Sequence, residues 1–183
     1  MRAIRPGRRF APDVKIALHK FTPALLSAED SSASALCEML GVAEPADWPP
    51  LFHDADSRGW FLRKLEADPL LAGWLGFYVV AEIEEHPTLA GSAGFKGPPN
   101  SEGMVEIGYS IVESLQRRGI ASAAIAQLVD RAFADPRVET VTAETPITFG
   151  ASRALLEKCG FVLTGTRTDA DDGELALYAR TSQ

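Results

Sequence analysis

The stretch QRRGIAS, residues Gln116–Ser122, joins a run typical of a β-strand to a run typical of an α-helix. The strand-like run before it is MVEIGYSIV (104–112), and the helix-like run after it is AIAQLVDRAF (124–133). A helix start exposes unpaired N–H groups and the positive end of the helix dipole, which favour anions. Gly119 allows a close approach of the backbone, Ala121 adds only a methyl group, and Arg117 and Arg118 can bind phosphate. The turn is therefore predicted to hold an anion, in particular a pyrophosphate.

Two well-known kinds of phosphate-binding turn fit these residues less well. A P-loop requires a G-K-[S/T] ending, which QRRGIAS lacks. A dinucleotide-binding G-x-G-x-x-G turn matches in spacing through Gly119, Ala121 and Ala124, but two of its three glycines are alanines. Such a turn normally follows the first strand of a parallel sheet, whereas antiparallel strands are predicted to come first here. A solvated turn without a ligand is the remaining alternative.

The composition is that of one soluble domain, with 46% hydrophobic and 23% charged residues among 183. The net charge is −7, and an acidic body lacks the basic surface that nucleic acid requires. No run approaches the roughly 18 apolar residues of a membrane span. Two cysteines and three scattered histidines form neither a disulfide framework nor a metal-ligand spacing. We expect a cytoplasmic protein without a metal, a membrane partner or a nucleic-acid partner.

The first 13 residues, MRAIRPGRRFAPD, are basic and lack the apolar segment of a secretory signal. They are predicted to be a flexible tail, and residues 14–183 a single domain. Within it, the hydrophobic pattern predicts strands at 14–19, 74–84, 89–96, 104–112, 138–145, 161–168 and 174–180. It predicts helices at 24–28, 33–40, 56–67, 124–133 and 151–159, a turn at 85–88, and a proline-rich loop at 44–50. The order indicates an α/β domain with a largely antiparallel sheet and one central strand–helix–strand unit.

QRRGIA resembles Q/R-x-x-G-x-G/A, the acetyl-CoA pyrophosphate loop of the GNAT superfamily of N-acetyltransferases. FGASRALLEKCGF (149–161) resembles that family's N-x-A-S-x-x-x-L-E-K-x-G-F segment. GMVEIGYSIV and LAGSAGFKG resemble its fourth and third strands. The resemblance covers residues 74–180 well and the first 70 only loosely, and it is closest to the branch that includes the ribosomal-protein N-terminal acetyltransferases.

The resemblance implies a GNAT fold, with a mixed, mostly antiparallel sheet of about six to seven strands flanked by helices. It implies a splay between the fourth and fifth strands, where the pantetheine arm of acetyl-CoA pairs with backbone near Ile111 and Val112. The pyrophosphate role falls on Gln116, Arg117, Arg118, Gly119, Ile120, Ala121 and Ser122. Phe149 stands at the family's asparagine position for the cofactor arm.

The chemistry implied is acyl transfer from a thioester to a primary amine, which must lose a proton to attack. Glu106 is the candidate base, because it shares one face of its strand with Gly108 and Ser110. Glu144 on the neighbouring strand is the second candidate, and an ordinary solvent-facing role is the alternative for Glu106. A backbone N–H near Ile111 or Val112 is expected to meet the oxyanion.

The family's acid step is altered, because Leu156 replaces the tyrosine that many members use. Ser152 is the remaining candidate for protonating the thiolate. Its alternative is a helix-start serine that bonds backbone N–H groups.

The acceptor site falls in the weakly matched first half of the chain. Trp48, Phe52, Tyr109 and Glu144 are predicted to contact the acceptor, with Trp60 and Phe61 as further aromatic candidates. Core or lid packing is the alternative for these aromatic residues.

The sequence thus predicts an acetyl-CoA-dependent N-acetyltransferase, acting as a monomer or homodimer on a small-molecule amine or a peptide N-terminus. A non-catalytic acyl-CoA-binding module is the alternative, and another donor such as succinyl-CoA stays open.

Overall fold

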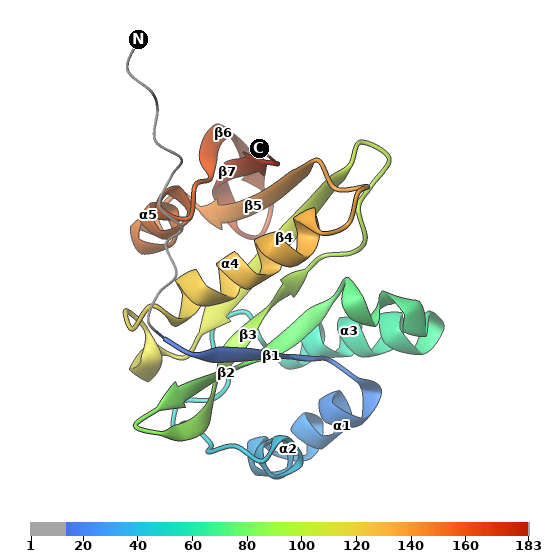
Figure 1. The fold of residues 1–183 in the computed structure, drawn as a ribbon, viewed down its shortest axis with the longest axis vertical. Coiled ribbons are helices and arrows are strands. Elements are labelled where there is room, and N and C mark those ends of the chain that lie inside the picture. Colours follow the sequence, from blue (N-terminus) through green and yellow to red (C-terminus); the bar gives the residue numbers. More distant parts are fainter. Residues whose placement is uncertain (1–13, 183) are drawn as a thin grey trace.

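The computed structural model describes residues 14–182, so the tail predicted for residues 1–13 lies outside the described range. Within this range, seven strands form one sheet in the order β1-β2-β3-β4-β5-β7-β6 (Figure 1). The β4–β5 pair is parallel and the other five neighbouring pairs are antiparallel, which confirms the predicted mixed sheet. The strands are β1 (Ile16–Lys20), β2 (Gly76–Ile83), β3 (His86–Phe95), β4 (Met104–Ile111), β5 (Thr140–Pro146), β6 (Val162–Asp169) and β7 (Gly173–Thr181).

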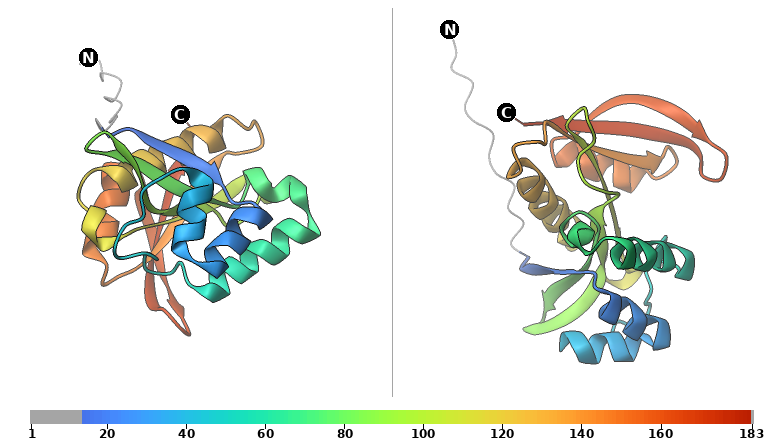
Figure 2. Two further views of the ribbon diagram at one scale, coloured as in Figure 1. Left: turned by 90° about the horizontal axis from the view of Figure 1, so that it is seen from below. Right: turned by 90° about the vertical axis from the view of Figure 1, so that its right-hand side faces the viewer.

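Helices cover both faces of the sheet, and each face has its own apolar core. The helices are α1 (Pro23–Ser31), α2 (Ala33–Leu40), α3 (Ala55–Ala67), α4 (Ile120–Phe133) and α5 (Gly150–Lys158). The right-hand view of Figure 2 shows α1–α3 on one side of the central strands and α4 on the other. Phe77, Ile107 and Leu128 belong to the core under α4 and α5, whereas Leu26 and Tyr78 belong to the core under α1–α3. No helix among residues 14–182 is long and apolar enough to cross a bilayer.

The first two helices begin where the sequence predicts, because their capping residues fix the backbone. Thr22 Oγ1 accepts a hydrogen bond from the Leu25 N–H at 3.2 Å, and Pro23 occupies the first turn. Ser32 Oγ accepts from the Ala35 N–H at 3.0 Å and starts α2, which ends at Gly41 in the left-handed region (φ 68°). The α1 helix is longer than predicted, because Ser32 is both the end of α1 and the cap of α2.

The turn predicted at residues 85–88 is wrong by about two residues. Glu84 and Glu85 form the turn instead, with φ of 49° and 68°, and His86 already pairs with Ile83 in the hairpin. Two positive φ values suit a tight hairpin, but glutamate is not the residue type that predicts them. Pro87 has no backbone N–H to donate, yet it is tolerated within β3. The β4 strand pairs only with Gly91–Phe95, so Pro87 lies outside the part of β3 that pairs with β4.

The parallel pair β4–β5 separates halfway along its length. Its register runs from Met104 opposite Thr140 to Ile107 opposite Ala143, and the strands do not pair beyond that point. The second half of β4 still pairs with β3, from Gly108 opposite Gly94 to Ile111 opposite Gly91. The predicted splay between the fourth and fifth strands is thus confirmed.

Two glycines on these strands predict opposite responses to an added methyl group. A Cβ at Gly91 would lie 2.1 Å from the Ser110 carbonyl oxygen, whereas a Cβ at Gly108 would meet nothing within 4 Å. We expect Gly91→Ala to lower the free energy of unfolding by about 2–3 kcal/mol through overpacking, and Gly108→Ala to change it by less than about 0.5 kcal/mol. Urea denaturation of both variants checks this. Equal losses would show that Gly91 is not the point of close approach.

Candidate active site

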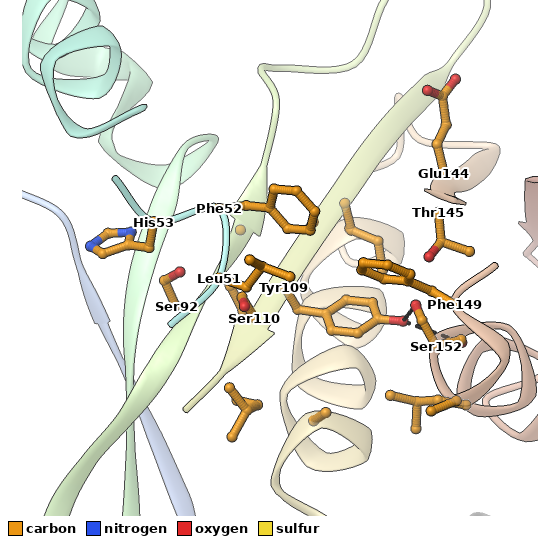
Figure 3. A pocket seen from close by; sticks show the side chains of 18 of the residues that line it. Leu51, Phe52, His53, Ser92, Tyr109, Ser110, Glu144, Thr145, Phe149 and Ser152 are labelled. Atoms are coloured by element: carbon orange, nitrogen blue, oxygen red, sulfur yellow. Dashed lines mark hydrogen bonds between the residues drawn. The ribbon is translucent and has the colours of Figure 1, made fainter. Parts of the chain in front are cut away.

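A pocket of about 1220 Å³ opens where β4 and β5 part. Its walls come mainly from β3, β4, the start of α4, the β5–α5 segment, the β6–β7 hairpin, α3 and the loop before α3. Figure 3 shows Tyr109 and Ser110 of β4 in the middle of this pocket, with Leu51 and Phe52 on one side and Phe149 and Ser152 on the other. Residues from both halves of the chain therefore meet in one space.

One end of the pocket is the QRRGIAS turn. Arg117 (φ 59°) and Gly119 (φ 85°) both adopt the left-handed conformation, and α4 begins at Ile120 directly after them. The helix therefore starts earlier than the predicted residue 124. No side chain caps this helix start, and Gly119, Ile120, Ala121 and Ser122 line the pocket. A helix N-terminus framed by small residues and Arg117 fits an anionic pyrophosphate.

Two residues assigned to this end differ from the expectation. Arg118 and Val112 are not among the residues that line the pocket, whereas Ile111, Gln116 and Arg117 are. The Gln116 side-chain amide donates to the Ile111 carbonyl oxygen at 3.0 Å, which ties the loop to the end of β4. Gln116 is thus the first residue of the motif and also holds the end of β4 through this hydrogen bond.

The backbone of β4 presents an open edge to the pocket. The Val112 N–H donates to the Ala90 carbonyl at 3.0 Å, and Lys96 N–H donates to the Glu106 carbonyl, so these positions face β3. Because N–H groups alternate in direction along an antiparallel strand, those of Tyr109 and Ile111 point towards β5, which has diverged. Val112 is therefore excluded as an oxyanion donor, and the Ile111 N–H is the group of the predicted pair that faces the gap.

Two hydroxyl groups meet beside this edge. Tyr109 reaches from β4 to α5, where its hydroxyl lies 2.9 Å from Ser152 Oγ. Burial raises the pKa of Tyr109 to about 12, although the hydrogen bond with Ser152 opposes this, so the phenol keeps its proton at neutral pH. Ser152 lies inside α5 and is not its N-cap. The N-cap position is held by Phe149, which makes no side-chain hydrogen bond to the helix. The sequence points to both residues but not to their contact.

The two candidate bases are both ion-paired. Glu106 lies with its side chain 27% exposed and forms an ion pair with Lys96, which lines the pocket. Glu106 itself is not among the lining residues. Glu144 does line the pocket, but Arg167 Nε donates to both of its carboxylate oxygens at 3.1 and 3.2 Å. These hydrogen bonds hold the pKa of Glu144 below its usual range despite burial, which makes it a weak base.

Aromatic side chains form part of the pocket wall. Phe52 and Phe149 line the pocket from two different segments, and their ring centroids are 6.1 Å apart. Trp60 and Phe61 also line it. The prediction that Trp48 contacts the acceptor is not supported by its position, since Trp48 is not a lining residue and packs between the two cores.

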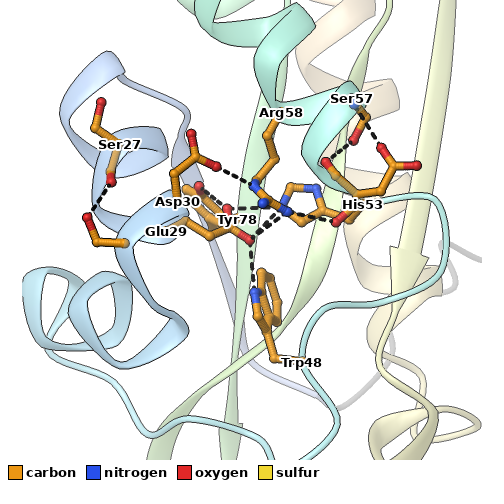
Figure 4. Close-up of polar contacts among 10 residues, drawn as sticks. Ser27, Glu29, Asp30, Trp48, His53, Ser57, Arg58 and Tyr78 are labelled. Carbon is orange, nitrogen blue, oxygen red and sulfur yellow. Dashed lines mark hydrogen bonds and ion pairs between the residues drawn. The ribbon is translucent and has the colours of Figure 1, made fainter.

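Trp48 belongs instead to a buried polar cluster around Glu29 (Figure 4). The Glu29 carboxylate accepts from Trp48 Nε1 at 2.9 Å, from the Tyr78 hydroxyl at 2.6 Å and from His53 Nε2 at 3.0 Å. The side chains of Glu29 and His53 are each only 2% exposed, and Arg58 Nη1 lies 3.8 Å from Glu29 Oε1. The cluster therefore joins α1, the loop 44–54, α3 and β2.

No local sequence signal predicts this cluster. Glu29 and Asp30 look like ordinary solvent-facing acids near the end of a short helix, and nothing local distinguishes the buried one. The effect of the cluster on the pocket is direct, because His53 follows Leu51 and Phe52 in the chain and itself lines the pocket. Anchoring His53 fixes the turn that presents both apolar side chains.

The comparisons with known proteins agree with this geometry. Residues 24–162 match the acetyltransferase (GNAT) domain family. An uncharacterised N-acetyltransferase of Bacillus subtilis, YjdG, is 29% identical over 142 residues, which is 77% of this chain and 82% of that protein. The chain thus belongs to the GNAT family of acetyltransferases, as the sequence motifs indicated, and is an acyltransferase.

Solved structures confirm the fold at low sequence identity. RimL, a ribosomal L7/L12 α-N-protein acetyltransferase solved with coenzyme A, has a TM-score of 0.63 at 17% identity, covering 93% of this chain and 96% of its own. The microcin C7 self-immunity acetyltransferase MccE, solved with acetyl-CoA and AMP, also has a TM-score of 0.63 at 17% identity, covering 92% and 93%. Both neighbours bind CoA or acetyl-CoA.

Removing the Glu29 charge should weaken the fold. Glu29→Gln places an amide N–H₂ where three donors converge, so we expect a loss of about 3 kcal/mol in the free energy of unfolding at pH 7. Asp30→Asn is the matched control, because Asp30 is 47% exposed in its surface ion pair with Arg58, and it should cost less than about 1 kcal/mol.

The difference between wild type and Glu29→Gln should also depend on pH. Burial raises the pKa of Glu29, but the hydrogen bonds and charge of His53, with Tyr78 and Arg58, lower it overall. A lowered folded-state pKa stabilises the fold fully above the unfolded value of about 4.3, and this contribution is lost as pH falls through the lower folded value. Urea denaturation between pH 7 and pH 3 measures the trend. A difference that stays constant would show that Glu29 is not ionised in the cluster.

Proposed function

We propose that the protein is an acetyl-CoA-dependent N-acetyltransferase that acts on a primary amine by direct transfer. The observation that carries this proposal is the position of the open β4 edge beside the uncapped start of α4, within one pocket. The turn at Gln116–Ser122 holds the pyrophosphate, and the Tyr109–Ile111 backbone edge holds the pantetheine arm. Bound acetyl-CoA supplies a thioester acetyl group.

The transfer forms a carbon–nitrogen bond and breaks the carbon–sulfur bond. The amine gives up one proton and the departing thiolate takes one up, so the protein needs a group for each transfer. The Ile111 N–H, which points into the gap, stabilises the negative charge that develops on the acyl oxygen.

Glu106 takes the proton from the amine through a water molecule. It lies on the same face of β4 as Gly108 and Ser110, which line the pocket. Glu106 itself lies in the half of β4 that still pairs with β5. A base that lies just outside a pocket can still act through one water. Both carboxylates are ion-paired, but Arg167 binds both oxygens of Glu144 and lowers its pKa, which supports Glu106 over Glu144 in this role.

The prediction for Glu106→Gln separates the enzyme from a non-catalytic acyl-CoA-binding module. We expect kcat to fall about 10²-fold or more, because a positioned base contributes on that scale, while the Kd for acetyl-CoA stays within about twofold. Thiol release and calorimetric titration with CoA measure the two quantities. Glu144→Gln is the matched control and should leave kcat within about fivefold. A protein that binds acetyl-CoA but releases no thiol with any amine would be the binding module.

Ser152 gives a proton to the thiolate, and Tyr109 positions it. The Tyr109 hydroxyl can donate to Ser152 Oγ at 2.9 Å, which leaves the serine proton free to point into the pocket. A thiol pKa near about 8.5 means that the thiolate leaves with little help, so this contribution is modest.

We expect Ser152→Ala to lower kcat by about tenfold, since the thiolate needs limited assistance. Tyr109→Phe should lower kcat by less and keep the ring packing. Ser152→Thr provides a check beyond simple loss, because it keeps a hydroxyl group and should retain more of kcat than Ser152→Ala. An unchanged kcat in Ser152→Ala and in Tyr109→Phe would remove the hydroxyl pair from the mechanism.

The acceptor class follows less directly from the fold. Among the structural neighbours, one from Salmonella typhimurium modifies the N-terminal serine of L7/L12, and a chimera of Vibrio cholerae SpeG and hSSAT is a spermidine N-acetyltransferase. Peptide α-amines and small amines are therefore both candidate acceptors. A cytoplasmic setting and a monomeric or dimeric state stay predictions, which cell fractionation and gel filtration test.

A further inference from the structure

We propose that the acceptor is a monoamine with a large apolar group next to the amine-bearing carbon, and that Leu51, Phe52 and Phe149 receive this group. The inference rests on the proposed N-acetyl transfer, since it names the class of amine that enters the same pocket. A peptide whose first residue is aromatic or branched aliphatic and a free arylalkylamine share this chemistry.

Exposed apolar surface is concentrated at this one place. Eight large hydrophobic side chains are exposed among residues 14–182, and four of them line the pocket. Leu51 is 60% exposed, Phe52 57%, Phe149 39% and Trp60 37%. Half of the exposed large apolar side chains thus face one cavity, which favours a ligand with apolar surface to cover them.

The apolar wall is held in place before any ligand arrives. Phe52 has a φ of 63°, which is unusual for a residue with a large side chain. The next residue, His53, is buried and bonded to Glu29, so the turn cannot easily relax. Across the pocket, Phe149 precedes α5 and lies 6.1 Å from Phe52 between ring centroids, tilted by 36°. Two rings fixed on separate segments form a preorganised surface for an apolar group.

Charge in the pocket disfavours a polyamine. The lining includes four cationic side chains, Lys96, Arg117, Lys158 and Arg167, but only two anionic ones, Glu144 and Asp172. Glu144 is already bonded to Arg167. A second ammonium group needs carboxylates that other cations do not neutralise. An acceptor with one positive charge therefore fits better than one with several.

Leu51 and Phe52 lie on the side of the pocket assigned to the acceptor, and Phe149 completes the wall from the β5–α5 segment. The donor arm pairs with the backbone of Tyr109 and Ile111, which points towards β5. Leu51, Phe52 and Ser110 all line the pocket, and Figure 3 shows Leu51 and Phe52 on the side away from Ser152. On the face of β4 that they share, Gly108 has no side chain and Ser110 has a small one, which leaves room for an amine to approach the thioester from there.

The test measures kcat/KM with acetyl-CoA for matched amines. One set is phenethylamine, ethanolamine and spermidine; the other is short peptides that differ only in a first residue of Phe, Leu, Ser or Glu. We expect the apolar members to exceed the polar ones by at least about tenfold within each set. The two sets distinguish a small amine from a peptide α-amine. Calorimetric titration of CoA-saturated protein with phenethylamine gives binding without turnover.

Variants of Phe52 and Phe149 test whether these side chains cause the preference for apolar amines. Phe52→Ala and Phe149→Ala should each reduce the preference for apolar amines by about tenfold, mainly through KM, and should weaken phenethylamine binding to match. Leu70→Ala is the matched control, because Leu70 is 88% exposed and lies outside the pocket, and it should change neither quantity.

Three results would overturn the inference. Equal or better rates for polar amines or spermidine would reject the apolar acceptor while acetyl transfer stands. A Phe52→Ala variant that changes the preference between acetyl-CoA and hexanoyl-CoA, and not between amines, would assign the wall to the donor. Acetyl-CoA binding without product from any amine would reject the proposed function, and this inference with it.

Discussion

The separation of β4 from β5 is the constraint on which the rest of the molecule depends. A sheet normally satisfies its backbone groups between neighbouring strands, and an unpaired edge inside a protein needs another partner. Here the pairing of β4 with β5 stops at Ile107 opposite Ala143, while the rest of β4 stays paired with β3. The rigid pairing on one side lets the other side stay open. The α4 turn, the Tyr109–Ser152 pair and the aromatic wall are all arranged around that opening.

The polar cluster at Glu29 holds the proline-rich loop in a fixed conformation. The loop 44–54 has little regular structure, so its backbone cannot be held by a ladder of hydrogen bonds. One carboxylate that accepts from Trp48 and His53 of the loop and from Tyr78 of β2 replaces that ladder. Asp47 adds a second anchor by accepting from the backbone and hydroxyl of Ser114, close to the QRRGIAS turn. The loop is thus tied to both halves of the pocket.

The features that sequence predicts correctly are those that depend on local patterns. Helix caps at Thr22 and Ser32, the strand–turn–helix around Gly119 and the closing hairpin all follow from short-range chemistry. Prediction fails where distant residues decide. Nothing near Glu29 shows that it is buried, and nothing near Trp48 shows that it faces Glu29 and not the pocket. The β2–β3 turn differs from its predicted position because its two glutamates adopt a conformation that their residue type does not favour.

The pairing of β1 with β2 has a consequence for how such a protein can diversify. The chain leaves the sheet after Lys20 and returns at Gly76, and Lys20 and Phe77 are direct partners in the antiparallel register. The whole intervening segment, with α1–α3 and the Leu51–Phe52 turn, therefore departs from and rejoins the same spot. Its two ends are fixed next to each other by the sheet, while Glu29 and Asp47 hold its interior to β2 and to the segment before the QRRGIAS turn. Residues can therefore be inserted or exchanged within this segment without a change in the register of β1 with β2.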